Sequence, residues 1–176
     1  DGPVLDDVLG QDQAKRAMII AAAGHHNILL SGSPGAGKTM LARTLPSLLP
    51  NLTSDEQIAV TKLHSLRGTN VESAITPPPF RSPNHTSSRI SLIGGGNPPK
   101  PGDISLAHHG VLFLDEIPEY PRATLESLRQ PLEDRSVAIS CKTDSTRPYV
   151  RNVSAHAYFI CGCKSARHTS LPLPPL

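Results

Sequence analysis

Hydrophobic residues along this chain fall into short apolar runs separated by stretches with helical spacing. Two apolar runs have no polar face, as in strands that are buried in a parallel sheet: Ile28-Leu29-Leu30 within residues 27–31, and residues 111–114. Apolar residues recur at helical intervals over residues 12–24, 38–49, 54–66 and 121–132. This alternation predicts an α/β fold in which helices flank a mainly parallel sheet.

The proline-rich segment 77–102, which also holds the triplet Gly94-Gly95-Gly96, interrupts this regularity. Proline removes a backbone donor, so we expect loops here around one short helix near residues 88–93. Further along, two short apolar stretches, residues 137–139 and 149–150, predict a hairpin. A third apolar stretch, residues 157–160, predicts a last strand. We therefore expect one core domain over residues 1–163 and an irregular proline-rich tail over 164–176.

A chain of 176 residues is long enough to bury a hydrophobic core as one domain. It begins at Asp1 rather than Met, so we expect a piece of a longer protein. No apolar run reaches the roughly 20 residues of a membrane helix, and no leader is evident, so we expect a cytoplasmic protein without a membrane partner. The three cysteines lack a regular spacing, which fits a reducing compartment.

The formal net charge of +2 is unevenly distributed. Residues 1–134 carry 11 Lys and Arg against 14 Asp and Glu, whereas residues 135–176 carry 6 against 1. The basic end is a candidate contact for nucleic acid. A solvated surface is the alternative reading.

A glycine-rich motif with the pattern G-x-x-x-x-G-K-[ST] follows the first apolar run and precedes a helix. Its residues are Gly32-Ser33-Pro34-Gly35-Ala36-Gly37-Lys38-Thr39. Glycines let successive backbone N–H groups face a phosphate, and the helix start adds its dipole. Lys38 would neutralise the β- and γ-phosphates, and the Thr39 hydroxyl would bind Mg²⁺. The motif predicts binding of ATP with Mg²⁺.

An acidic pair, Asp115-Glu116, ends the apolar run of residues 111–114. A carboxylate at a neighbouring strand end can hold Mg²⁺ directly or through water, and we assign this role to Asp115. Glu116 can accept a proton from water that attacks the γ-phosphate. The predicted catalytic residues are therefore Glu116 and Lys38.

Longer strings carry a family resemblance over about residues 4–140. They are residues 9–17, 21–24, 79–86, 92–96, 101–108, 110–118 and 128–134, together with the phosphate loop. With these strings the chain resembles the AAA+ ATPases of the magnesium chelatase group, and within that group it is similar to the ComM (YifB) proteins.

The resemblance implies a ring-forming ATPase, usually hexameric, that binds ATP between subunits. ComM proteins are associated with DNA branch migration, which makes DNA a candidate partner. It also implies that Val8, Leu9 and Gly10 lie beside the adenine. The stretch Gly94 to Asp103 would be the helix-2 insertion that faces the pore of the ring, and Val137 to Val150 the hairpin before the sensor strand.

Two basic residues of the proline-rich segment, Arg81 and Lys100, are candidate DNA contacts. The alternative is that their side chains are simply solvated at the surface. The chain departs from the family pattern after Ser140. Where relatives show a strand that leads to Asn-Pro, the strand here leads to Cys161-Gly162-Cys163-Lys164, and a shift of the reading frame is one hypothesis for this difference. The helical lid that carries the arginine finger and the second sensor in this family also has no counterpart in these residues.

Three functions remain open from the sequence. The first is a ring motor that hydrolyses ATP to remodel or move along DNA, and the second is the ATPase subunit of a metal chelatase. The third is a nucleotide-dependent binding switch, or a piece that binds ATP without turnover. The strings of residues 82–105 favour the ComM-like motor, and the intact Glu116 argues against an inactive site. We expect ATPase activity only in the full-length oligomer.

Overall fold

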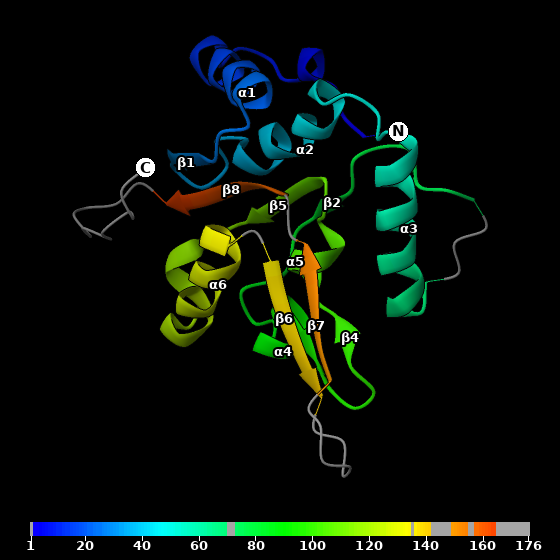
Figure 1. Ribbon diagram of the computed structural model, residues 1–176. Helices are drawn as coiled ribbons and strands as arrows, with labels where there is room; N and C mark the ends of the chain where they lie inside the picture. The colour runs from blue at the N-terminus through cyan, green and yellow to red at the C-terminus, as the bar shows by residue number, and fades with distance from the viewer. Residues whose placement is uncertain (1, 70–72, 135, 142–148, 155–156, 165–176) are drawn as a thin grey trace.

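A four-stranded parallel sheet forms the centre of the computed structural model, which describes residues 2–69, 73–134, 136–141, 149–154 and 157–164 (Figure 1). The strands lie in the order β1 (Ile28–Gly32), β8 (Ala157–Lys164), β5 (Gly110–Leu114) and β2 (Phe80–Arg81). All three strand pairs are parallel. The predicted α/β class with a mainly parallel sheet is confirmed.

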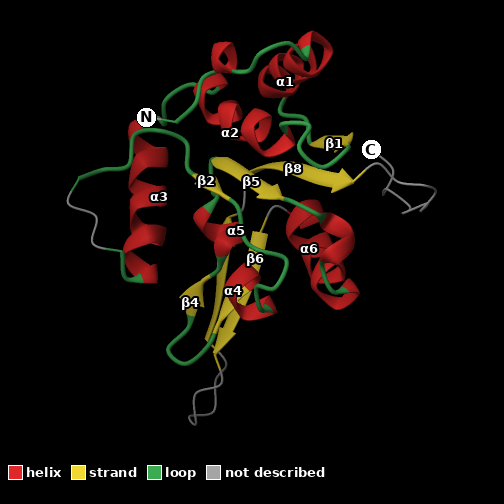
Figure 2. Cartoon of the chain, turned by 180° about the vertical axis from the view of Figure 1, so that it is seen from behind, coloured by secondary structure: helices red, strands yellow, loops and turns green. Residues whose placement is uncertain are grey.

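Helices cover both faces of this sheet (Figure 1, Figure 2). One face carries α1 (Asp12–Gly24) and α2 (Lys38–Leu48), and the other carries α4 (Arg89–Ile93), α5 (Asp103–Leu106) and α6 (Arg122–Asp134). The 3₁₀ turns η1 (Leu5–Asp7) and η2 (Ile117–Glu119) precede α1 and α6. None of the helices in the described part of the chain is long and apolar enough to cross a membrane.

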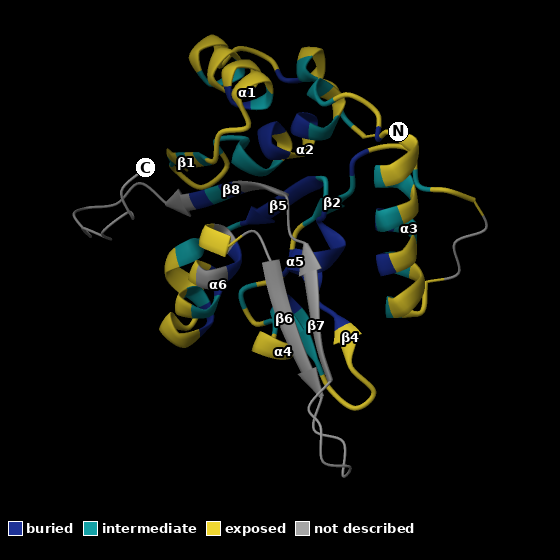
Figure 3. Ribbon diagram, viewed as in Figure 1, coloured by how far each residue is buried: buried dark blue, intermediate teal, exposed yellow. Residues whose placement is uncertain are grey.

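A hydrophobic core lies on each face of the sheet. The strand β5 contributes to both cores because its side chains alternate between the two faces. Val111 and Phe113 pack with residues of α1 and α2, whereas Leu112 and Leu114 pack with α4, α5 and α6. Every residue of β5 is buried, which Figure 3 shows as a dark blue strand in the middle of the molecule. The apolar run of residues 111–114 therefore predicts a buried interior strand correctly.

The helix α3 (Ser54–Arg67) packs beside α5 and β4 (Lys100–Pro101). It begins after Thr53, which forms a capping box with Glu56. Gly68, with φ of 95°, ends the helix in the left-handed region.

The proline-rich segment has more structure than the sequence predicts. The expected short helix is α4, but the segment also contains the edge strand β2, and β3 (Gly94–Gly95) pairs with β4 as a two-residue antiparallel ladder. Proline is tolerated at sheet edges, and among the described residues β2 pairs with β5 alone. The sequence missed these strands because two-residue elements leave no periodicity.

The predicted hairpin consists of β6 (Ser136–Cys141) and β7 (Tyr149–Ser154), which pair in antiparallel register from Ser136↔Ser154 to Cys141↔Tyr149. The last strand, β8, is longer than predicted and runs through Lys164. The rest of the expected tail, residues 165–176, lies outside the described residues.

Candidate functional site

The phosphate-loop motif forms the turn between β1 and α2, at the carboxyl edge of the sheet. Gly35 and Gly37 have φ angles of 80° and 77°, in the left-handed region that favours glycine. Gly37 is the residue that precedes α2, and the Ala36 N–H donates to the Ser33 carbonyl over 3.2 Å. The turn therefore presents backbone groups and a helix start together, as the motif predicts.

The Lys38 side chain folds back over this turn. Its Nζ donates to the carbonyl oxygens of Gly32 and Ser33, each over 2.9 Å. The ammonium group is thus held over the first residues of the loop, where its charge complements an anion.

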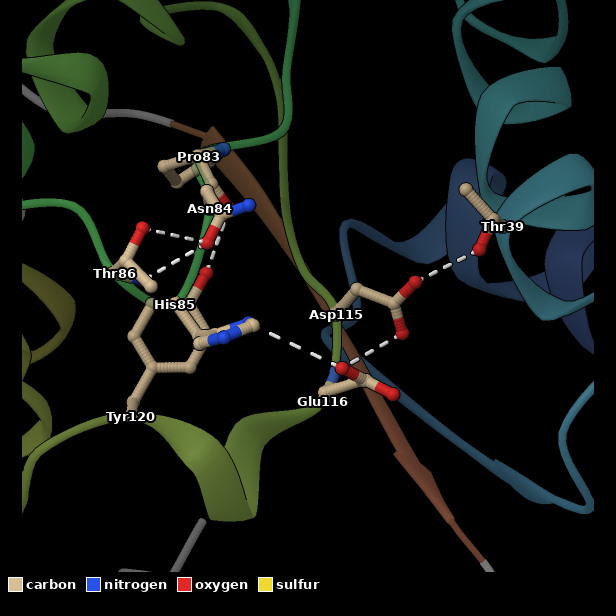
Figure 4. Close-up of polar contacts among 8 residues, drawn as sticks. All are labelled: Thr39, Pro83, Asn84, His85, Thr86, Asp115, Glu116 and Tyr120. Carbon is tan, nitrogen blue, oxygen red and sulfur yellow. Dashed lines mark hydrogen bonds and ion pairs between the residues drawn. The ribbon is translucent and has the colours of Figure 1, made fainter.

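Thr39 and Asp115, which are 76 residues apart in the chain, meet across the sheet edge (Figure 4). The Thr39 hydroxyl in the first turn of α2 donates to Asp115 Oδ2 over 2.8 Å, and the Glu116 N–H donates to Asp115 Oδ1 over 2.9 Å. A hydroxyl and a carboxylate in contact are oxygen donors of the kind that Mg²⁺ prefers, so these residues fit the expected metal.

Glu116 follows directly but points to a different side (Figure 4). Its backbone lies in the left-handed region, with φ of 52°. The carboxylate Oε2 is 4.0 Å from His85 Nδ1, and 38% of the Glu116 side chain is exposed. The two carboxylates of the acidic pair therefore have different neighbours, Thr39 for Asp115 and His85 for Glu116.

His85, which we did not predict as a neighbour of the acidic pair, is held by the turn after β2. The Tyr120 hydroxyl donates to the Pro83 carbonyl over 2.7 Å, and the His85 ring packs edge-on against the Tyr120 ring. Burial raises the pKa of Tyr120 to about 12, and the negative charges of Asp115 and Asp103 add to this shift. The hydroxyl therefore stays protonated and keeps donating near neutral pH.

A side-chain to main-chain turn completes this loop, since the Thr86 N–H and hydroxyl both donate to Asn84 Oδ1 over 2.9 Å. The only sequence signal for His85 was its place in the family string of residues 79–86. His85 lies close to Glu116 because β2 pairs with β5, and the sequence did not predict this pairing.

The residues expected beside the adenine divide between core and surface. Val8 is buried and packs with Met18 and Leu41, whereas the Leu9 side chain is 91% exposed. Gly10 has a φ of 67° and turns the chain toward α1. The following residue, Gln11, contacts the phosphate loop through a hydrogen bond from its Nε2 to the Ala36 carbonyl. No local pattern around Gln11 predicts this contact.

The two candidate DNA contacts differ in their surroundings. Arg81 is partly exposed and is bound to a buried carboxylate, since its Nε donates to Asp103 Oδ1 over 3.0 Å and its Nη2 contacts the same oxygen. Lys100 in β4 is exposed.

The strand β8 lies between the strand of the phosphate loop and the strand of the acidic pair. Its Gly162 is beside Asp115, and a Cβ on Gly162 would come within 2.7 Å of Asp115 Oδ1. Lys164, at its end, is in register with Gly32. The backbone of β8, in the part of the chain that departs from the family pattern, thus lies within the sheet next to the candidate site.

Comparisons with known proteins agree with this architecture. The sequence model of the family "Magnesium chelatase, subunit ChlI" matches residues 4–171. An uncharacterised protein, YifB, of Escherichia coli K12 is 50% identical over 137 residues, and competence protein ComM of Haemophilus influenzae is 51% identical over 141 residues. Each of these matches covers 77% of this chain and 27% of the relative, so the chain spans about a quarter of the length of these curated relatives.

Solved structures show the same fold at low sequence identity. A chain in the complex between subunits BchI and BchD of magnesium chelatase has a TM-score of 0.70 at 19% identity, with coverage of 94% of this chain and 56% of that one. NtrX from Brucella abortus in complex with ATP has a TM-score of 0.58 at 22% identity, with coverage of 92% and 30%. The fold is therefore the P-loop AAA+ core.

The family match covers nearly the whole chain, and relatives at about 50% identity share most of its length. The chain belongs to the magnesium chelatase subunit ChlI family of AAA+ proteins and is similar to its ComM and YifB members.

Proposed function

We propose that this chain is the ATP-binding and Mg²⁺-binding core of a ComM-like ring motor that hydrolyses ATP to remodel or translocate DNA. The contact between Thr39 and Asp115 carries the nucleotide part of this proposal. It joins the phosphate-loop helix to the strand of the acidic pair in the arrangement that a bound Mg²⁺ needs.

In this proposal the backbone N–H groups of Gly32 to Thr39 bind the phosphates, and Lys38 adds its charge at the β- and γ-oxygens. Thr39 and Asp115 hold Mg²⁺, which neutralises the phosphate charge when it is bound. Glu116 accepts a proton from the attacking water, since it stands beside Asp115 without sharing its contact to Thr39. Val8, Leu9 and Gly10 border the adenine.

The rest of the site comes from neighbouring subunits, so the active form is a homo-oligomeric ring, with six subunits as the expected number. Similarity to competence protein ComM supports DNA as the partner, and the exposed Lys100 and the excess of basic residues after residue 134 agree with it. The same proposal includes a core domain over residues 1–163, a tail over residues 164–176 and a cytoplasmic location.

Two alternatives rest on specific observations. The likeness to the chain in the BchI–BchD complex favours the ATPase subunit of a metal chelatase. The 27% coverage of the relatives favours a piece that binds ATP without turnover, because the partner residues for hydrolysis would lie elsewhere.

The first test is the binding of ATP with Mg²⁺ by Lys38→Ala. We expect a loss of at least about 100-fold in affinity, because the variant removes a charge that faces two phosphates. Lys62→Ala, which changes an exposed lysine of α3, is the matched control and should bind like the original protein. Unchanged affinity in Lys38→Ala would refute the phosphate-loop assignment.

The second test separates binding from hydrolysis in the full-length ring. Glu116→Gln should bind ATP normally and lose at least about 100-fold in turnover, because the amide cannot accept the proton. Normal turnover would exclude Glu116 as the base. Stimulation of the ATPase by branched DNA would favour the motor, and its absence together with stimulation by a porphyrin-metallating partner would favour the chelatase.

A further inference from the structure

The start of α1 is tied to the phosphate loop by one side chain, that of Gln11. Its Nε2 donates to the Ala36 carbonyl over 2.6 Å, across a separation of 25 residues. The main chain of Gln11 is fixed independently, since its carbonyl accepts the first hydrogen bond of α1 from Lys15 N–H over 2.9 Å. The side chain therefore reaches the loop from an anchored position.

The chain before Gln11 is arranged to bring this side chain to the loop. Gly10 and Gln11 both have left-handed backbones, with φ angles of 67° and 55°. This conformation is uncommon for a residue with a side chain such as glutamine. Three residues earlier, Val8 is buried in the core with Leu41 of α2. The turn that presents Gln11 is thus held on the same helix that the phosphate loop precedes.

The contact has a consequence for the next N–H group of the loop. The carbonyl of Ala36 and the N–H of Gly37 belong to one planar trans peptide, so they point in opposite directions. A donor that holds the carbonyl on the side of α1 directs the Gly37 N–H to the opposite side of the peptide. Gly37 is fixed from the other end as well, because its carbonyl accepts from Leu41 N–H over 2.9 Å.

The packing around Gly37 agrees with this view. A Cβ on Gly37 would lie 3.2 Å from Gln11 Nε2, which is tighter than an ordinary van der Waals contact. The second glycine of the pattern G-x-x-x-x-G-K-[ST] therefore meets two requirements here, a positive φ and the close approach of Gln11.

The geometry points to Gln11 as a positioning residue of the nucleotide site, which holds the Ala36–Gly37 peptide so that the Gly37 N–H faces the phosphates. The inference rests on the proposed binding of ATP. Gln11 lies outside the phosphate-loop motif, and we assign it a role in the binding of the phosphates rather than of the adenine.

The test compares Gln11→Ala and Gln11→Glu with matched changes at Gln13, a second exposed glutamine two positions along α1. Affinities of the intact protein are measured for ATP with Mg²⁺ and for inorganic tripolyphosphate with Mg²⁺. Loss of one hydrogen bond predicts that Gln11→Ala weakens the binding of both ligands by about 2- to 10-fold. Gln11→Glu should weaken both further, because a carboxylate cannot donate to the carbonyl, while Gln13→Glu controls for the added charge.

A structural readout accompanies the affinities. The Gly37 amide should exchange its hydrogen faster and change its NMR chemical shift in Gln11→Ala, but not in Gln13→Ala, while the melting temperature stays the same. Binding of both ligands that is unchanged in the Gln11 variants would overturn the inference. A loss confined to ATP would also overturn it, since that result would assign Gln11 to the adenine.

The proposed function fails in a different way. If the original protein binds neither ATP nor tripolyphosphate, the phosphate-loop assignment itself is wrong. If the original protein binds both and Lys38→Ala does not, the proposed nucleotide site stands whatever the Gln11 variants show.

Discussion

The phosphate loop, residues 32–39, and the proline-rich segment taken together with α5, residues 77–106, lie on either side of β5 but are built on different principles. The loop takes its shape from its own backbone, with left-handed glycines followed by a helix start. The segment has little regular structure and is held by side chains that bond to distant main-chain groups, as Tyr120 does to Pro83 and Arg67 to Pro101. The shape of the phosphate loop can be predicted from eight consecutive residues. The structure of the proline-rich segment depends on contacts that exist only in the folded chain.

The comparison predicts that changes in the segment reduce stability, whereas changes in the loop reduce ligand binding. The largest effect is expected for Gly102→Ala. Gly102 is buried between α4 and α5, and a Cβ there would overlap main-chain atoms of Leu92, Ile93 and Gly94. Backbone cannot move as a side-chain end can, so we expect a loss of about 3 kcal/mol or more in the free energy of unfolding, measured by denaturant titration.

The matched change in the loop is Gly35→Ala. A Cβ on Gly35 meets no atom within 4 Å, so the main penalty is its φ of 80°, worth about 1–2 kcal/mol. This variant should lose ATP binding while keeping most of its stability. Equal losses of stability in Gly35→Ala and Gly102→Ala would break the comparison.

The difference between the two regions also decides what the sequence could predict. The phosphate loop, α1, α2 and β5 were predicted within a residue or two, because glycine, capping and apolar patterns are local signals. The acidic pair followed from the position of β5, and its contact with Thr39 agrees with the roles that the sequence suggested. In the proline-rich segment only α4 was predicted. The strand β2 and the neighbours His85 and Glu116 depend on pairing between segments about 30 residues apart, which no local pattern encodes.

A second prediction concerns the ion pair inside the segment. Arg81 contacts Asp103, whose side chain is only 7% exposed, so Arg81→Ala would leave a buried carboxylate without this partner. We expect a loss of about 2 kcal/mol in the free energy of unfolding. The control is Arg122→Ala, which removes an ion pair to Glu126 with side chains that are 91% and 65% exposed, and it should cost less than about 0.5 kcal/mol.

This prediction sharpens the comparison because it also separates two uses of Arg81. If Arg81 binds DNA rather than stabilising the segment, Arg81→Ala would weaken DNA binding and leave the unfolding free energy close to that of Arg122→Ala. An unfolding transition that moves with Arg81→Ala alone would assign the side chain to the interior of the segment. The exposed Lys100 then remains the better candidate for a DNA contact in this part of the chain.

The smallest expected effect is a dependence of stability on pH that comes from His64 in α3. Its Nε2 lies 3.2 Å from the Leu106 carbonyl at the end of the segment. Burial lowers the pKa of His64, the charge of Arg81 lowers it further, and the contact with Leu106 opposes this shift. The unfolded chain therefore binds a proton at a higher pH than the folded chain does. Stability from this group is present above the unfolded value of 6.5 and is lost as the pH falls from there through the folded pKa.

The variant His64→Gln tests this expectation, because its amide can donate to the Leu106 carbonyl but does not titrate. Free energies of unfolding are measured for both proteins between pH 8 and pH 5, and their difference is compared, since the other histidines are common to both. The difference should shift in favour of His64→Gln as the pH falls below 6.5. A constant difference would show that His64 titrates alike in the folded and unfolded chains. Its contact with Leu106 would then not stabilise the segment through the neutral ring, and the attachment of α3 to the segment would rest on Arg67 and Pro101.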